Sequence, residues 1–271
     1  MPSPSPPSPP PPPILEIPLF NRPSLLPAIT AGARRIELNA PGSYAAGGTT
    51  PSLSLVRMVS SDLDSLPFPV PLRVMVRPRG GDFHYSDQER GQIQTSITEL
   101  KDILNHPRGD GFVFGALTPT PEGGGGGGGW SIDADLCTSV LGWARPFPVV
   151  FHRAFDEAIG SEGGPGVEEM LEVVKGLGFG GLLTSGGVGN ARDNLAVVGR
   201  IVRLAGGGLE VVVGGGIRGG NVMGIYEELR GVEGARVVYH SSCLSGPGSG
   251  EEVDVEEVRR IVGVLGAGGH D

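Results

Sequence analysis

Charged side chains follow a short apolar run in the segment Leu72 to Asp87, where LRVMV is succeeded by Arg77, Pro78, Arg79, two glycines and Asp82. Two guanidinium groups beside glycines are suited to bind an anion, because glycine lets backbone N–H groups approach a ligand closely. Solvation of a surface loop would also explain these arginines. We favour the anion site because the arginines flank a rigid proline.

His152, Arg153 and Asp156 follow a second apolar run, which begins at Phe147. An imidazole beside a carboxylate and a guanidinium suits a general acid or base, because histidine changes protonation near neutral pH. A lone histidine on an apolar strand is equally well explained as a packed side chain. We keep both interpretations and predict that His152 and Asp156 are catalytic and that Arg153 binds a ligand.

Glu16 and Glu37 lie inside the apolar segments ILEIPLF and RRIELN. An ionised carboxylate in a protein interior is costly unless a cation or hydrogen-bond donors compensate it. We expect Arg77, Arg79 and Arg153 to be these partners. A satisfied ion network and a catalytic carboxylate explain the pattern equally well, so both stay open, with Glu37 as the catalytic candidate.

Glycines and hydroxyl groups follow the later apolar runs. Gly214 to Gly216 come after LEVVV, and such bare backbone N–H groups are suited to bind phosphate. His240 precedes two serines and is either a donor to an anion or a packed residue. The predicted catalytic residues are Glu37, His152 and Asp156. The predicted ligand-binding residues are Glu16, Arg77, Arg79, Asp82, Arg153, Ser185, Gly214, Gly215, Gly216 and His240.

Apolar runs alternate with amphipathic stretches, and this order decides whether the polar residues can meet. Strand candidates occupy 14–20, 34–39, 72–76, 111–117, 147–156, 181–184, 209–213 and 237–240. Helix candidates occupy about 23–31, 51–60, 86–105, 133–144, 167–177, 195–202, 222–229 and 253–265. Eight such units predict an α/β protein, a (β/α)8 TIM-type barrel, in which all strand ends open onto one rim. The rival is a doubly wound open sheet, which usually carries GxGxxG after its first strand.

Composition limits the classes of function. The net charge of −9 and the pI near 5.1 argue against a nucleic-acid-binding surface, which needs clustered lysine and arginine. The sequence has no apolar run of the roughly 20 residues that a membrane span needs. Cys137 and Cys243 are far apart and suggest neither a disulfide framework nor a CxxC metal site. We therefore expect a cytoplasmic protein without membrane or nucleic-acid partners.

Low-complexity segments define the domain boundaries. Residues 1–13 predict a disordered proline-rich arm, for which an SH3-type or WW-type partner has weak support. Residues 14–266 form the expected barrel, with a flexible glycine-rich insertion at 121–130. Residues 267–271 predict a disordered tail. The sequence leaves open whether the chain forms a homo-oligomer.

An ordered set of motifs resembles the CutC copper-homeostasis family: RIELN, GGTTPS, VMVRPRGGDFHYSD, FVFGALTP, PVVFHRAFD, LLTSGG and VVVGGGI. The resemblance covers most of the chain from Ile14 to about Ser242. It implies a TIM-type barrel and a cytosolic protein linked to copper handling or copper binding. Copper is implied by this resemblance only.

One departure from the family is chemical. The family's proposed copper site uses cysteines where this chain has Pro18 and Asn39, and neither side chain suits a soft copper(I) ion. We therefore predict no metal ligands. The first functional hypothesis is a copper-homeostasis protein. The alternative is an isomerase-type or lyase-type enzyme on a small phosphorylated or carboxylated metabolite, in which Arg77 and Arg79 hold an anion and Glu37 with His152 moves a proton.

Overall fold

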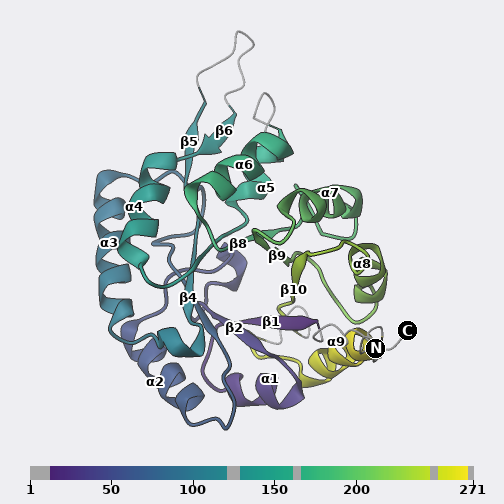
Figure 1. The fold of residues 1–271 in the computed structure, drawn as a ribbon. Helices are drawn as coiled ribbons and strands as arrows, with labels where there is room; N and C mark the ends of the chain where they lie inside the picture. The colour runs from purple at the N-terminus through teal and green to yellow at the C-terminus, as the bar shows by residue number, and fades with distance from the viewer. Residues whose placement is uncertain (1–12, 121–128, 161–165, 245–249, 268–271) are drawn as a thin grey trace, which may run out of the picture.

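Eight parallel strands close into a barrel in the order β1-β10-β9-β8-β7-β4-β3-β2. The computed structural model describes residues 13–120, 129–160, 166–244 and 250–267. Helices form a ring around these strands (Figure 1). The predicted TIM-type barrel is therefore confirmed.

The described elements follow the predicted order. The barrel strands are β1 (Ile14–Leu19), β2 (Arg35–Leu38), β3 (Leu72–Met75), β4 (Gly111–Phe114), β7 (Val149–Phe151), β8 (Gly181–Thr184), β9 (Glu210–Val213) and β10 (Arg236–His240). The α-helices are α1 (Leu25–Ala31), α2 (Leu53–Asp64), α3 (Asp87–Lys101), α4 (Ala134–Ala144), α5 (Ala154–Gly160), α6 (Val167–Leu177), α7 (Leu195–Ala205), α8 (Val222–Leu229) and α9 (Val255–Ala267). Ser86 and Glu89 form a capping box at the N-terminus of α3.

Two local predictions are wrong. The predicted strand 111–117 ends at Phe114, and Leu117 begins β5 (Leu117–Pro119), which pairs antiparallel with β6 (Trp130–Ile132) outside the barrel (Figure 1). The predicted strand 147–156 is limited to β7, Val149–Phe151, because α5 begins at Ala154 and buries Phe155. Both errors come from reading apolar residues beyond a strand end as a continuation of that strand.

Some predicted boundaries fall on undescribed segments. Residues 121–128 of the predicted insertion, 1–12 of the arm and 268–271 of the tail lie outside the described residues. Trp130, the last residue of the predicted insertion, belongs to β6. Within the described part of the chain, no helix is both long and apolar enough to cross a lipid bilayer.

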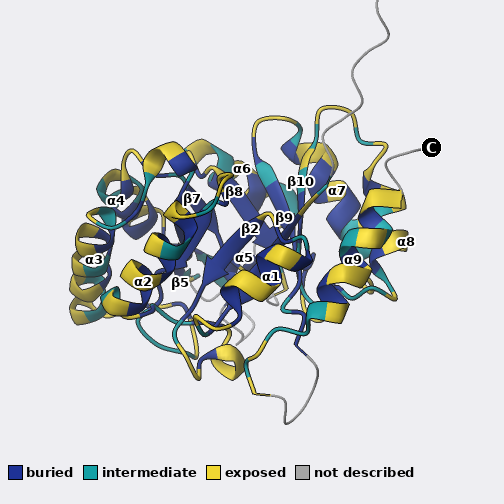
Figure 2. Cartoon of the chain, turned by 90° about the horizontal axis from the view of Figure 1, so that it is seen from below, coloured by how far each residue is buried: buried dark blue, intermediate teal, exposed yellow. Residues whose placement is uncertain are grey.

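The strands bury both faces, and burial is concentrated in the middle of the molecule (Figure 2). Because side chains alternate along a strand, Glu16 points to the face opposite that of Leu15 and Ile17, which pack in the core shared with the helices. The same alternation turns Glu37 inward. The barrel interior also holds a separate apolar cluster of Met75, Val113, Val150, Leu183, Val212 and Val238. The register places Glu16 opposite Arg35 and His240, and Glu37 opposite Arg73, so a polar layer lies beside this apolar cluster.

Candidate functional site

A cavity of about 700 Å³ opens where the barrel strands end. This is the rim at which barrel enzymes place their sites, and the volume lies within the range of small-ligand pockets. Predicted site residues that line it are Glu37, Arg77, His152, Arg153, Asp156, Gly215, Gly216 and His240. The geometric expectation that residues from distant parts of the chain share one cavity agrees with this arrangement.

Arg79 and Asp82 do not line the cavity. The guanidinium of Arg79 bonds the carboxylate of Asp82 (2.9 Å) and that of Glu89 (2.5 Å), and its side chain is 38% exposed. The predicted role of Arg79 in holding an anion at the rim does not fit this position, because its charge is directed to the start of α3. Glu16, Ser185 and Gly214 lie behind the cavity lining and contact residues that form it.

Arg77 lines the cavity, but its guanidinium donates hydrogen bonds to backbone carbonyl groups. It donates to the carbonyl oxygens of Ala46, Gly48 (3.3 Å) and Gly81 (2.5 Å). Its guanidinium also lies 4.5 Å from the ring centroid of Phe83. Arg77 therefore holds together the loops after β2 and β3, and among its nitrogens Nε alone is buried without a hydrogen bond.

Asp156 is buried beneath the loop that follows β8. Its carboxylate accepts hydrogen bonds from Thr184 Oγ1, from the backbone N–H (2.9 Å) and hydroxyl (2.8 Å) of Ser185, and from Gly187 N–H (3.2 Å). Arg153 Nε also donates to it (2.9 Å). With so many donors on its two oxygens, Asp156 organises a loop and has little capacity left to accept a proton from a ligand.

His152 is a buried, neutral imidazole. Its Nδ1 accepts from the Ala154 N–H (3.2 Å), so the ring proton lies on Nε2, which has no hydrogen-bond partner among the described residues. A Cβ at Gly115 would lie 2.4 Å from Nδ1, so only glycine leaves room for this ring. Burial, with a contribution from the charge of Arg77, lowers the pKa of His152 to about 3. A group with this pKa is a weak base near pH 7.

His152 should make the fold sensitive to acid. Between pH 6.5 and about pH 3 the unfolded chain binds a proton at His152 that the folded chain does not. The free energy of unfolding therefore decreases as the pH is lowered, by up to about 1.4 kcal/mol per pH unit. The stability that the neutral ring contributes is complete above pH 6.5. When the pH is lowered from 7 to 5, we predict that the free energy of unfolding falls by about 2 kcal/mol less in His152→Gln than in the wild-type chain. Urea unfolding of both proteins at these two pH values measures it, and equal losses would contradict the prediction.

Glu16 forms a buried ion network with an arginine that the sequence interpretation did not choose. Arg35 donates to Glu16 and to Glu210 (2.6 Å), and both Glu16 and Arg35 are buried. Although burial opposes it, the charge of Arg35 and the hydrogen bond from His240 lower the pKa of Glu16 to about 2. The expected partners Arg77, Arg79 and Arg153 are bonded elsewhere.

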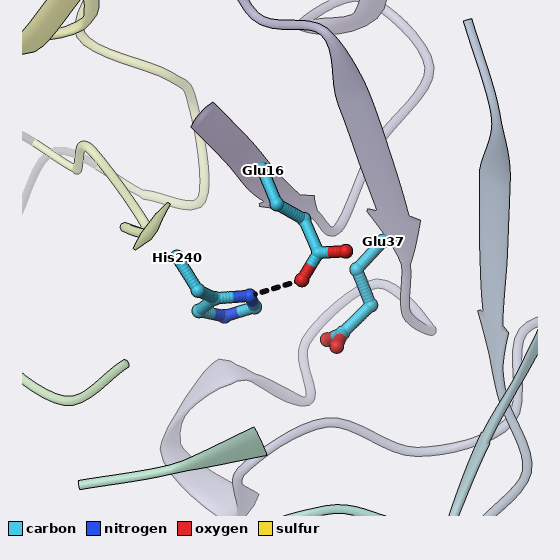
Figure 3. Close-up of side chains that lie close together, drawn as sticks. All are labelled: Glu16, Glu37 and His240. Carbon is cyan, nitrogen blue, oxygen red and sulfur yellow. Dashed lines mark hydrogen bonds and ion pairs between the residues drawn. The ribbon is translucent and has the colours of Figure 1, made fainter. Parts of the chain in front are cut away.

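Glu37 lies beside this network without sharing its arginine. Asn39 Nδ2 donates to Glu37 Oε1 (2.9 Å), whereas the buried Glu37 Oε2 lacks a partner among the described residues. His240 Nδ1 donates to Glu16 Oε1 (2.7 Å), and the side chains of Glu16, Glu37 and His240 point toward one another (Figure 3). Burial raises the pKa of Glu37. Burial would lower the pKa of His240, but its hydrogen bond to Glu16 and the charge of Glu37 raise it.

Sequence reasoning missed Arg35 and Arg218. Arg218 lines the cavity and donates to the hydroxyls of Ser241 (3.2 Å) and Ser242 (3.3 Å) after β10. Arg218 could have been predicted from its position two residues after the glycine run, in the segment that connects a strand end to the next helix. The signal for Arg35 was its spacing, since it faces the same side of β2 as Glu37.

The sulfur atoms do not form a soft-metal site at the cavity. Cys137 and Cys243 are buried away from its lining, and burial raises the pKa of Cys137 to about 12 and that of Cys243 to about 11. Both thiols are therefore protonated near pH 7, whereas copper(I) prefers a thiolate. Among the described residues that line the cavity, Met75 is the one that carries sulfur. The donor set around the cavity does not fit copper(I).

The comparisons with known proteins agree with the barrel and its rim. The model of the CutC family matches residues 13–242, which include every barrel strand. The chain belongs to the CutC family.

Relatives in the CutC family are named for copper. The chain is 36% identical over 237 residues to the human copper homeostasis protein cutC homolog, covering 88% of this chain and 76% of that protein. It is 33% identical over 213 residues to the Caenorhabditis elegans copper homeostasis protein cutC homolog, covering 79% of this chain and 75% of the relative. A crystal structure assigned to the copper homeostasis protein CutC of Streptococcus agalactiae superposes with a TM-score of 0.68 at 25% identity, covering 84% of this chain and 98% of that one.

Proposed function

We propose that this chain acts in copper homeostasis in the cytoplasm and that the cavity at the barrel rim is its working site. The observation that carries the proposal is the match to the CutC family over residues 13–242, whose strand ends build that cavity. Relatives in this family carry the name copper homeostasis protein.

Copper is the cargo in this proposal, and the donor chemistry limits its form. The cavity presents carboxylate, imidazole and amide groups from Glu37, His240 and Asn39. Such oxygen and nitrogen donors suit copper(II), whereas copper(I) prefers sulfur. The role proposed for the cavity is therefore contact with copper(II) or with a small molecule that carries it.

The metabolite-enzyme alternative has less support. It needed Arg77 and Arg79 to hold an anion, and the guanidinium groups of both are bonded to protein oxygens. It also needed His152 as a proton carrier, and burial keeps that imidazole neutral. Arg153 and Arg218 still line the cavity and are the basic groups that such a reaction would have to use.

A growth experiment tests the copper role. Cells that lack their own CutC-family gene are grown over a range of copper concentrations with either this chain or an empty vector. We predict that the chain raises the copper concentration that halves growth at least about two-fold, with no change in cobalt tolerance, which serves as the control. Equal copper tolerance with and without the folded chain at matched expression would refute the role.

A further inference from the structure

Three metal-ligating side chains meet at one end of the barrel interior. Glu16, Glu37 and His240 come from the neighbouring strands β1, β2 and β10, and the strand register places Glu16 directly opposite His240. One ligand atom from each residue lies within 4.8 Å of the others. Glu16 and Glu37 are 2% and 3% exposed, so these carboxylates are no ordinary acidic surface patch. Figure 3 shows their side chains converging with the imidazole.

A second observation points to a missing ligand. Glu37 Oε2 is covered from solvent and has no hydrogen-bond donor among the described residues. Leaving a buried carboxylate oxygen without a partner costs free energy, typically more than for a neutral group. Arg35 donates from Nε to Glu16 and from Nη1 to Glu210, and its buried Nη2 makes no hydrogen bond to Glu37. A buried carboxylate oxygen that has no hydrogen-bond partner is a ligand atom that a bound cation would satisfy.

We propose that Glu16, Glu37 and His240 bind a divalent cation of borderline softness, of which zinc(II) and copper(II) are the examples. The copper part of this proposal rests on the proposed function and adds to it the oxidation state of the copper. Zinc binding at the same residues stands without it.

The donor set explains the choice of ion. Two carboxylates and one imidazole suit zinc(II) and copper(II), and affinity among divalent ions rises toward copper(II). Ligand atoms of a tetrahedral ion with bonds of about 2.1 Å lie about 3.4 Å apart, so binding must draw the three groups together. On Glu37, the oxygen without a hydrogen-bond partner, Oε2, is the one that would contact the ion. Arg35 offsets the charge of Glu16, and Asn39 orients Glu37 by donating to its other oxygen.

Calorimetric titration of the chelator-stripped full chain with zinc(II) near neutral pH tests the site. We predict one equivalent bound, and an affinity reduced at least about ten-fold in Glu37→Gln. The matched control is Glu157→Gln, which removes the same charge from the same cavity outside the cluster and should change affinity less than two-fold. Copper(II) provides a second readout, since its electron paramagnetic resonance spectrum should show coupling to one imidazole nitrogen that is lost in His240→Gln.

Each outcome decides something. Zinc affinity that is equal in the wild-type chain and in Glu37→Gln, or a copper(II) spectrum unchanged in His240→Gln, would overturn the site. If zinc affinity fell as much in Glu157→Gln as in Glu37→Gln, the binding would reflect the overall charge of the cavity, and the proposed site would be contradicted. Urea unfolding of each metal-free variant shows whether it folds, and Glu37→Gln should be at least as stable as the wild type because it removes a buried carboxylate with an unpartnered oxygen. If the chain raises copper tolerance but binds no metal at these residues, this inference alone is contradicted. If the chain binds metal there but does not raise copper tolerance, the proposed function is contradicted.

Discussion

Replacing Arg35 by alanine should lower the free energy of unfolding by about 3 to 5 kcal/mol, because the change removes the arginine that pairs with the buried carboxylate of Glu16. Arg35 is 3% exposed and donates to both Glu16 and Glu210. Without it, Glu16 keeps the hydrogen bond from His240 and the charge of Arg73 but loses its ion pair with an arginine. Urea unfolding near pH 7 measures the loss.

Arg22 supplies the matched control for Arg35. It forms an ion pair with Asp62 whose two hydrogen bonds are 2.7 and 2.8 Å long, yet its side chain is 47% exposed. Exposed pairs contribute about 0 to 1 kcal/mol, because water screens the charges. Arg22→Ala should therefore cost much less than Arg35→Ala. Similar losses in the two variants would show that burial of the network has little energetic weight.

Replacing Asp156 by alanine should also cost about 3 to 5 kcal/mol, because one buried carboxylate satisfies several donors. Thr184, Ser185 and Gly187 all donate to it from the end of β8 and the loop that follows. Arg153, which lines the cavity, would lose its ion pair as well. The measurement is again urea unfolding, with limited proteolysis of the loop as a local readout.

Asp82→Ala is the control for Asp156. Its carboxylate pairs with Arg79 at 2.9 Å, but the Asp82 side chain is 54% exposed. We expect a loss below about 1 kcal/mol and no new cleavage in the loop after β8. If Asp156→Ala were as mild as Asp82→Ala, its carboxylate would have to be free for another role, such as the proton transfer that the sequence suggested.

The fold was predictable from sequence because parallel strands buried on both faces leave continuous apolar runs, and eight such runs alternate with amphipathic stretches. The inward direction of Glu16 and Glu37 was predictable for a related reason. A charged residue inside such a run must either point into a polar interior or find a partner. The partner itself was not predictable, because pairing Glu16 with Arg35 depends on the register between β1 and β2.

The loop residues show why a site is harder to predict than a strand. Arg79 follows a strand end, as rim residues do, but Glu89 at the start of α3 draws its guanidinium away from the cavity. Asp156 was expected at the end of a strand and instead lies in α5, which turns its carboxylate toward β8. Local sequence sets which groups are near the rim. The packing of neighbouring loops sets which of them face the cavity.

The location of bound metal tests the central claim most directly. Crystals of the full chain grown with copper(II) and measured at the copper absorption edge give an anomalous difference map. The claim predicts one strong peak between Glu16, Glu37 and His240 at the barrel rim. A map whose peaks lie at Cys137 or Cys243, with none inside the cavity, would contradict it.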